Sequence, residues 1–176
     1  MTNQDIIEKA KKVKLLILDI DGVMTDGRVI YGIYGDELKF FDVQDGFGIT
    51  LLHRAGIKSV IITAKKSRIV KMRARDLKTV KTYQGYIDKL IPFNKILRKF
   101  RVKPDEVCFI GDDLIDIPVL KRVGFAIAVP NAVEEVKNIA HHVTQKMGGR
   151  GAVREICDLI LKSQGKWDLA TAKYFK

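Results

Sequence analysis

The chain has 176 residues, 47% of them apolar, with 32 lysines and arginines against 21 aspartates and glutamates. This length and apolar content predict a single domain over residues 1–176 that buries its own core. The two cysteines, Cys108 and Cys157, lie in apolar or helical patterns, which argues against a disulfide framework and a cysteine-based zinc site. No apolar run has the length of a membrane span and the N-terminus lacks a signal-peptide core, so we expect a cytoplasmic protein.

The net charge of +11 is concentrated in one part of the chain. Residues 65–103 contain fourteen basic and two acidic residues, a net charge of +12. Such a surface attracts anions, and composition does not choose between sugar phosphates, nucleic acid and an ordinary solvated lysine-rich surface. Few aromatic residues are interleaved for base stacking, so a nucleic-acid-binding module is the weaker alternative.

Strand and helix patterns alternate along the chain after a short amphipathic helix at the N-terminus. The predicted strands are residues 15–20, 58–63, 79–83, 107–110, 125–129 and, weakly, 142–144. The predicted helices are residues 47–55, 67–77, 89–100, 115–123, 133–139 and 152–161. The alternation predicts an α/β fold, a doubly wound, Rossmann-like parallel sheet with helices on both faces. Residues 163–176 read as a polar tail with scattered aromatic residues.

One insert, residues 28–43, interrupts this alternation. Its segments RVIYGIY and ELKFFDV predict two strands joined at Gly35 and Asp36, which are typical of a tight hairpin turn. A hairpin alone would be marginally stable and would leave its edges unpaired. Its apolar side chains exceed what a solvated flap needs: Val29, Ile30, Tyr31, Ile33, Tyr34, Phe40 and Phe41. They could be covered by hairpins of other subunits or by the domain to which the hairpin belongs.

Acidic and hydroxyl side chains follow three of the predicted strands. They are Asp19 and Asp21 after the first strand, Thr63 at the end of the second, and Asp112, Asp113 and Asp116 after VCFIG. In a doubly wound sheet, ligands collect at the carboxyl ends of the central strands. Gathered carboxylates raise one another's pKa unless a cation neutralises them, which predicts a bound metal. Oxygen ligands without nearby histidine or cysteine favour Mg²⁺ over zinc.

Magnesium beside a carboxylate nucleophile is typical of a phosphoryl-transfer site. Asp19 could attack phosphorus and form an acyl phosphate. Asp21, two residues later, could donate a proton to the leaving group and then accept one from water. Lys89 and Thr63 could hold the transferring phosphoryl group. A lone DIDG segment would be an ordinary capped turn, whereas its combination with GDDLID indicates catalysis.

The ordered segments DIDGVMTDG, IITA, DK and GDDLID resemble the haloacid dehalogenase superfamily of phosphohydrolases, across residues 15 to about 145. FDVQDGFGI, GDDLIDIPVL and MGGRGAVREICDLIL resemble, more narrowly, its 3-deoxy-D-manno-octulosonate 8-phosphate phosphatase family, over nearly the whole chain. This resemblance implies a hairpin insert, no cap domain and a phosphatase of lipopolysaccharide sugar synthesis. The glycine-rich stretch also occurs beside some sialic acid cytidylyltransferases, so another 2-keto sugar acid phosphate is an alternative substrate.

The resemblance also implies catalytic roles. Asp19 would be the nucleophile and a Mg²⁺ ligand, and Asp21 the acid/base, whose backbone carbonyl also binds the metal. Asp112 would be the remaining carboxylate ligand. Thr63 and Lys89 would hold the phosphoryl group. Asp113 and Asp116 would orient the metal-bound waters or Lys89.

The residues implied in binding the sugar acid lie mainly after the hairpin. They are Asp42, Val43, Gln44, Asp45, Gly46, Thr50, Lys65 and Arg73, together with Asp21 and Lys89. Arg150, between glycines before a helix, could add a charge to a backbone nest for an anion, or that stretch could simply be a flexible helix start. Where the family has Thr-Gly-Arg, this chain has Thr63-Ala64-Lys65, which replaces a bidentate guanidinium by a single mobile charge.

The resemblance implies a homotetramer in which hairpins pair between subunits and a neighbour completes each active-site wall. From a different class, a phosphoacceptor signalling domain also combines acids, Mg²⁺, threonine and lysine on a parallel sheet. Such domains place the phosphorylated aspartate after the third strand, whereas here the predicted nucleophile follows the first. The expected partner is a small sugar acid phosphate, without nucleic acid or membrane.

Overall fold

The computed structural model describes residues 2–34 and 37–175. A sheet of six parallel strands forms its centre, in the order β5-β4-β1-β6-β7-β8. The strands are β1 (Leu15–Leu18), β4 (Lys58–Thr63), β5 (Lys81–Gln84), β6 (Val107–Gly111), β7 (Phe125–Ala128) and β8 (His142–Val143). β1, β6 and β7 are buried along their whole length because helices cover both faces of the sheet, which explains their continuous apolar runs. The prediction of a doubly wound parallel sheet is confirmed.

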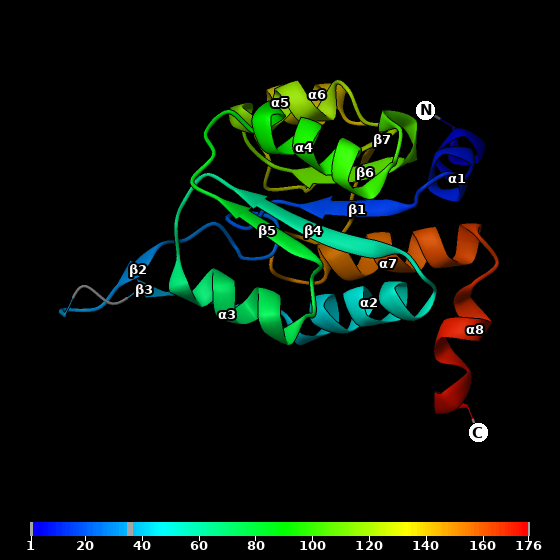
Figure 1. The fold of residues 1–176 in the computed structure, drawn as a ribbon, viewed down its shortest axis with the longest axis horizontal. Helices are drawn as coiled ribbons and strands as arrows, with labels where there is room; N and C mark the ends of the chain where they lie inside the picture. Colours follow the sequence, from blue (N-terminus) through cyan, green and yellow to red (C-terminus); the bar gives the residue numbers. More distant parts are fainter. Residues whose placement is uncertain (1, 35–36, 176) are drawn as a thin grey trace.

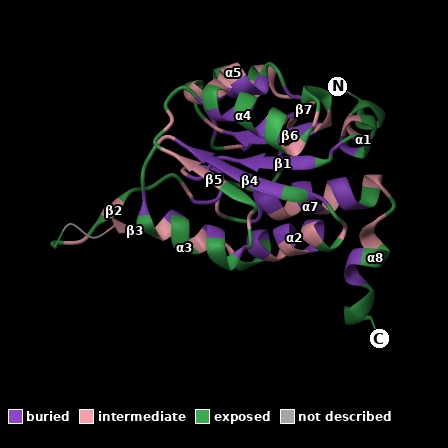
Figure 2. Cartoon of the chain, viewed as in Figure 1, coloured by how far each residue is buried: buried purple, intermediate pink, exposed green. Residues whose placement is uncertain are grey.

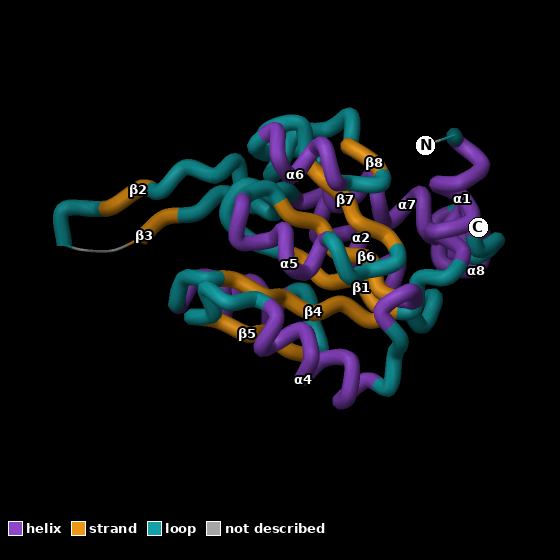
Figure 3. The backbone as a smooth tube through the Cα atoms, turned by 90° about the horizontal axis from the view of Figure 1, so that it is seen from above, coloured by secondary structure: helices purple, strands orange, loops and turns teal. Residues whose placement is uncertain are grey.

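Helices lie on both faces of this sheet (Figure 1). Helices α4, α5 and α6 cover one face and α2, α3 and α7 the other, and Figure 3 shows the same layers from above. The helices are α1 (Asn3–Lys11), α2 (Val43–Arg54), α3 (Arg68–Asp76), α4 (Leu90–Phe100), α5 (Ile117–Leu120), α6 (Glu134–Ile139), α7 (Ala152–Ser163) and α8 (Trp167–Thr171). Short 3-10 turns are formed by Pro104–Glu106, Leu114–Asp116 and Ala172–Tyr174. Both cysteines are buried and free, as the sequence predicts.

Helix α2 begins earlier than its sequence pattern predicts. The carboxylate of Asp42 accepts hydrogen bonds from the backbone N–H of Gln44, at 2.6 Å, and of Asp45, at 3.2 Å. These bonds satisfy two of the unpaired donors of the first helical turn, so the helix starts at Val43 rather than at Phe47. The prediction of a strand extending through Val43 is therefore wrong.

The hairpin is shorter than predicted and projects beyond the carboxyl end of β1 (Figure 1). Strands β2 (Ile30–Tyr31) and β3 (Glu37–Leu38) pair antiparallel in a separate sheet. The predicted turn residues, Gly35 and Asp36, lie outside the described residues. Ile33 and Tyr34 are each 91% exposed, so the hairpin does not fold back onto its own domain (Figure 2). No further inserted domain is found among residues 2–34 and 37–175, in agreement with the expected absence of a cap.

The predicted polar tail contains helix α8 and the 3-10 turn Ala172–Tyr174. Trp167 packs partly buried against the core, and Ala170 is buried. The ring of Tyr174 lies edge-on to Phe47 of α2 at 5.4 Å, and the guanidinium of Arg54 lies 5.3 Å from the same ring. The tail therefore lies against α2. Among the described helices, none combines the length and apolar character needed to cross a membrane.

Candidate active site

Three carboxylates converge at the carboxyl ends of β1 and β6. Asp19 follows β1, while Asp112 and Asp116 follow β6, its neighbour in the sheet. One ligand oxygen from each lies within 4.8 Å of the others. The Oδ1 atom of Asp112 is buried and has no hydrogen-bond partner among residues 2–34 and 37–175. Hard carboxylate oxygens with an unsatisfied buried atom are donors that fit a Mg²⁺ ion.

Lys89 neutralises part of this cluster. It lies immediately before α4, and its side chain is 0% exposed. Its ammonium is 2.6 Å from Oδ1 of Asp116 and 2.9 Å from Oδ2 of Asp19. The other oxygen of Asp116 accepts bonds from the backbone N–H of Asp112 and Asp113. Asp116 thus fixes both the lysine and the turn that carries Asp112.

The remaining negative charge makes two carboxylates hard to ionise. Burial raises the pKa of Asp19 to about 7, with Asp116 adding to the shift and Lys89 opposing it. Burial also raises the pKa of Asp112 to about 8, reinforced by the neighbouring Asp19 and Asp116. One lysine does not balance two buried acids and a half-buried one, so the cluster favours a further cation.

Glycines bring the surrounding loops close to the cluster. Gly22 has a φ of +88°, and a Cβ there would collide with the carboxylate of Asp112. A Cβ at Gly148 would collide with the carbonyl of Gly22. Asn131 joins the same two segments, because its amide donates to the Gly22 carbonyl and accepts from the Gly148 N–H, both at 2.8 Å. The glycine-rich stretch is therefore packed against the loop after β1.

Asp21 lies beside the hairpin rather than inside the cluster. Its Oδ1 atom is paired with the ammonium of Lys39, which is also 3.0 Å from Oε1 of Glu37. Sequence reasoning missed Lys39 because it lies outside every catalytic motif. Its only signal was the alternation of Glu37 and Lys39, which places both side chains on one face of a strand.

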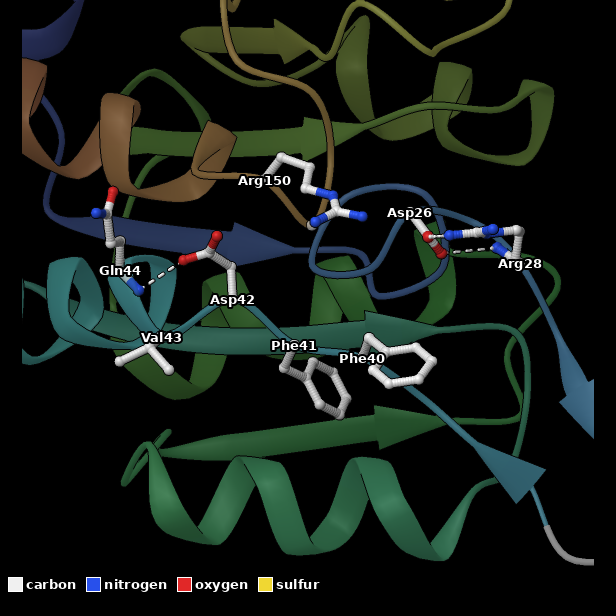
Figure 4. A pocket seen from close by; sticks show the side chains of 9 residues that line it. Asp26, Arg28, Phe40, Phe41, Asp42, Val43, Gln44 and Arg150 are labelled. Atoms are coloured by element: carbon white, nitrogen blue, oxygen red, sulfur yellow. Dashed lines mark hydrogen bonds and ion pairs between the residues drawn. The ribbon is translucent and has the colours of Figure 1, made fainter.

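Several predicted substrate residues line a hollow of about 670 Å³ at the base of the hairpin (Figure 4). It is lined by Asp26, Arg28, Phe40, Phe41, Asp42, Val43, Gln44, Gly149 and Arg150. Arg28 holds Asp26 through a 2.9 Å bond from its Nε atom, and Arg150 reaches into the same hollow. The bond from Arg28 is the main cause of the lowered pKa of Asp26, to which Arg150 also contributes. Arg28, Phe40 and Phe41 were not predicted to bind substrate.

Other predicted substrate residues do not line this hollow. Asp45 is 1% exposed, and its Oδ1 atom accepts a 2.8 Å bond from the backbone N–H of Arg154 in the first turn of α7. Burial raises its pKa to about 6. Gly46 is buried beside Arg73, and the hydroxyl of Thr50 donates to the carbonyl of Gly46. These residues shape the start of α2 and α7 in this chain, and their predicted contacts with the substrate stay a prediction.

The two cations expected to hold the substrate carboxylate are also outside the hollow. Arg73 donates a 3.0 Å bond from Nη2 to the backbone carbonyl of Asp42, and its guanidinium lies 5.4 Å from the ring of Phe41. It supports the wall of the hollow from behind. Lys65 is exposed after β4, close enough to Glu37 to lower the pKa of that carboxyl, although hydrogen bonds from Ser67 and Lys39 contribute more.

Thr63 and Asp113 complete the set of predicted residues. Thr63 is buried at the end of β4, and its carbonyl accepts bonds from Gly85 and Tyr86. Asp113 is exposed, and its carboxylate accepts a bond from the N–H of Leu114 at the start of a 3-10 turn. Lys89 is paired with Asp19 and Asp116, and the role of Asp113 in orienting metal-bound waters stays a prediction.

Comparisons with known proteins agree with this arrangement. Residues 62–156 match the haloacid dehalogenase-like hydrolase family. The chain is 46% identical over 167 residues to 3-deoxy-D-manno-octulosonate 8-phosphate phosphatase KdsC of Yersinia pestis, covering 95% of this chain and 89% of that protein.

Two solved structures extend the comparison. The 3-deoxy-D-manno-octulosonate 8-phosphate phosphatase of Moraxella catarrhalis, in complex with a magnesium ion, a phosphate ion and KDO, is 40% identical with a TM-score of 0.95 over 98% of this chain and 99% of that one. The cobalt-bound deoxy-D-mannose-octulosonate 8-phosphate phosphatase of Haemophilus influenzae is 36% identical with a TM-score of 0.89 over 95% and 98%. This chain therefore belongs to the haloacid dehalogenase-like hydrolases, in the family of the 3-deoxy-D-manno-octulosonate 8-phosphate phosphatases, and is a phosphoric monoester hydrolase.

Proposed function

We propose that this chain hydrolyses 3-deoxy-D-manno-octulosonate 8-phosphate to the free sugar acid and phosphate, with Mg²⁺ as cofactor, in lipopolysaccharide biosynthesis. The observation that carries the proposal is the cluster of Asp19, Asp112 and Asp116 with Lys89 at the carboxyl ends of β1 and β6. The relatives named for this activity, and the magnesium, phosphate and KDO in the Moraxella structure, support the choice of substrate and metal.

The reaction begins with attack of an Asp19 oxygen on phosphorus, which forms an aspartyl phosphate and breaks the bond to the sugar oxygen. Lys89, within 2.9 Å of that carboxylate, would offset the charge of the phosphoryl group, and Thr63 would donate a hydroxyl hydrogen bond. Asp21 would donate a proton to the departing sugar oxygen. It would then take a proton from the water that hydrolyses the aspartyl phosphate.

Asp19, Asp112 and the backbone carbonyl of Asp21 would hold the metal, and the position of Asp116 in the cluster supports a share in that role. When bound, Mg²⁺ supplies positive charge that makes attack by one anion on another possible. The raised pKa values of Asp19 and Asp112 support this assignment, because a cation would return both groups to their ionised form.

The hollow beside the hairpin would bind the sugar acid. Phe40 and Phe41 offer apolar surface, whereas Asp42 and Gln44 can bond hydroxyl groups. Arg28 and Arg150 bring positive charge to the same wall, and a guanidinium can bind a carboxylate through two parallel bonds. A 2-keto sugar acid has both hydroxyl groups and a carboxylate, so the lining supports this class of substrate.

The exposed apolar side chains of the hairpin support a homo-oligomer, and we propose a tetramer in which hairpins pair between subunits. The hairpin at the edge of the hollow would let a neighbouring subunit contribute to the active-site wall. We also propose one phosphatase domain over residues 1–176, acting in the cytoplasm without nucleic-acid or membrane partners.

The direct test measures phosphate release from 3-deoxy-D-manno-octulosonate 8-phosphate and from other sugar-acid phosphates, with Mg²⁺ and after EDTA. We expect metal-dependent release, abolished in Asp19→Asn and reduced about 10²–10⁴-fold in Asp21→Asn. Asp168→Asn, an exposed aspartate in α8, serves as the matched control. Faster hydrolysis of a sialic acid phosphate would show that the proposed substrate is wrong. A long-lived aspartyl phosphate without turnover would favour a signalling domain.

A further inference from the structure

Lys39 is held in a fixed position at the base of the hairpin. Its side chain is 0% exposed, and its ammonium contacts Asp21 on one side and Glu37, at 3.0 Å, on the other. Glu37 lies close to Ser67, the residue that caps α3, and the two line the same hollow. A chain of polar contacts therefore runs from the loop after β1, through the return arm of the hairpin, to the loop after β4.

The local sequence places these two side chains together. Glu37 and Lys39 are two residues apart along an extended segment, so they project from the same face. Leu38 between them projects from the other face and is exposed. Removing a charged side chain from water costs free energy unless an opposite charge lies close to it. Here Asp21 supplies a second opposite charge for the Lys39 ammonium.

Each of the two predicted catalytic aspartates is paired with a different lysine. Lys89 contacts Asp19 but forms no ion pair with Asp21, whereas Lys39 contacts Asp21 but forms none with Asp19, within the part of the chain that the structure describes. Among the described residues, Lys39 is the only side chain that donates a hydrogen bond to the Asp21 carboxylate. A carboxylate with one fixed partner has its rotamer set by that partner.

We propose that Lys39 is a positioning residue for Asp21, one that directs the Asp21 carboxylate toward the leaving-group oxygen and makes this orientation depend on the hairpin. The inference rests on the proposed role of Asp21 as the acid that protonates the leaving group. Loss of the contact would leave the attack by Asp19 intact but misplace the proton donor, and small misplacements of a catalytic group can cost as much as about 10²-fold in rate.

This role predicts a dependence on the leaving group. A sugar alkoxide needs a proton in order to leave, whereas nitrophenolate leaves readily without one. In Lys39→Met, pre-steady-state release of the leaving group should therefore fall on the order of tenfold or more for the sugar-acid phosphate. It should fall less than about threefold for p-nitrophenyl phosphate. Across substituted phenyl phosphates, the rate should depend more steeply on the pKa of the leaving phenol.

Two further variants separate positioning from a structural effect. Lys39→Arg retains a cation on this face and should recover most of the lost rate, whereas Lys121→Met, an exposed lysine after α5, should match the wild type. In the Asp21→Asn background, adding Lys39→Met should cause little further loss, because a residue that acts through Asp21 has nothing left to position. Circular dichroism and thermal melts of each variant report whether the fold is retained.

Equal losses for all leaving groups, an unchanged Lys39→Met, or a full additional loss in the double variant would each overturn the inference while leaving the phosphatase function standing. Wild-type inactivity on every phosphate ester tested would instead overturn the proposed function, and the inference with it.

Discussion

The ammonium of Lys89 lies 2.6 Å from Oδ1 of Asp116, and both side chains are 0% exposed. Replacing Lys89 by methionine would keep the apolar stem but leave Asp116 and Asp19 without their cation. Breaking a buried ion pair on one side costs roughly 3–5 kcal/mol, so we expect a loss of this size in the free energy of unfolding measured by urea at pH 8. Lys95→Met, an exposed lysine on the same helix, should change that energy by less than about 1 kcal/mol. A Lys89→Met chain as stable as the wild type would show that the pair contributes no net stability.

Magnesium binding should release protons near neutral pH. Burial raises the pKa of Asp19 to about 7 and of Asp112 to about 8, so in the metal-free protein both groups are partly protonated over this range. Because ligands must lose their protons to bind a metal, the affinity for Mg²⁺ should rise as pH increases from 6 to 8.

Calorimetric titration with Mg²⁺ in buffers of different ionisation enthalpy measures this release. Asp112→Asn should bind Mg²⁺ more weakly and release fewer protons than the wild type. A binding enthalpy independent of the buffer at pH 6 and pH 7 would contradict the raised pKa values.

Much of this architecture is predictable because its signals are local. The apolar runs of β1 and β6 end in acids, and parallel strands bring those ends to one edge. The start of α2 was misplaced because FFDV contains aromatic and β-branched residues that are typical of strands, whereas the cap formed by Asp42 depends on backbone geometry. The contacts of Lys39 with Asp21 and of Asp45 with Arg154 were not predicted for a different reason, since the partners lie 18 and 109 residues away. Such contacts follow from the tertiary fold, and no local pattern encodes them.

Asp45 should make stability depend on pH. Burial raises its pKa to about 6, with a further increase from Asp42, although backbone N–H groups of α7 oppose the shift. A raised pKa means that the folded state binds the proton more tightly than the unfolded state. Asp45 therefore favours folding below about pH 4, and this contribution is lost as the pH rises through about 6.

The variant Asp45→Asn mimics the protonated side chain at every pH. Relative to the wild type, its free energy of unfolding should increase by about 2 kcal/mol between pH 4 and pH 7. Urea unfolding at each pH measures the difference, with exposed Asp168→Asn as the control. A difference that stays constant across this range would show that Asp45 titrates normally in the folded protein.

The exposed aromatic side chains of the hairpin should mediate self-association. Tyr34 is 91% exposed and Phe40 66% exposed, which is unfavourable for aromatic side chains in a monomer. Charged side chains in Tyr34→Lys with Phe40→Lys should prevent hairpins from packing together and yield smaller, less active species. Light scattering measures the mass, with Leu169→Lys, an exposed apolar position on α8, as the control. A monomeric wild type at assay concentrations would contradict the proposed assembly.

Carboxylate recognition should depend on Arg150 more than on Lys65. Arg150 lines the hollow beside Asp42, whereas Lys65 does not line it and Arg73 is bonded to a backbone carbonyl behind its wall. A charge-assisted bond to the substrate contributes roughly 1.5–3 kcal/mol, so Arg150→Ala should raise KM for the sugar-acid phosphate about tenfold or more. Since this contact is made equally before and during the reaction, kcat should change little. Hydrolysis of p-nitrophenyl phosphate, which has no carboxylate, should stay near the wild-type rate.

Lys65→Ala provides the comparison, because the sequence predicts that Lys65 binds the substrate carboxylate. If the carboxylate binds in the hollow of one subunit, KM in Lys65→Ala should change less than about threefold, and Lys65→Arg should not improve affinity. A larger effect at Lys65 than at Arg150 would move the carboxylate to the loop after β4, where Lys65 lies near Glu37. Equal damage to both substrates in Arg150→Ala would instead assign Arg150 to the fold of the glycine-rich stretch, which packs against the loop after β1.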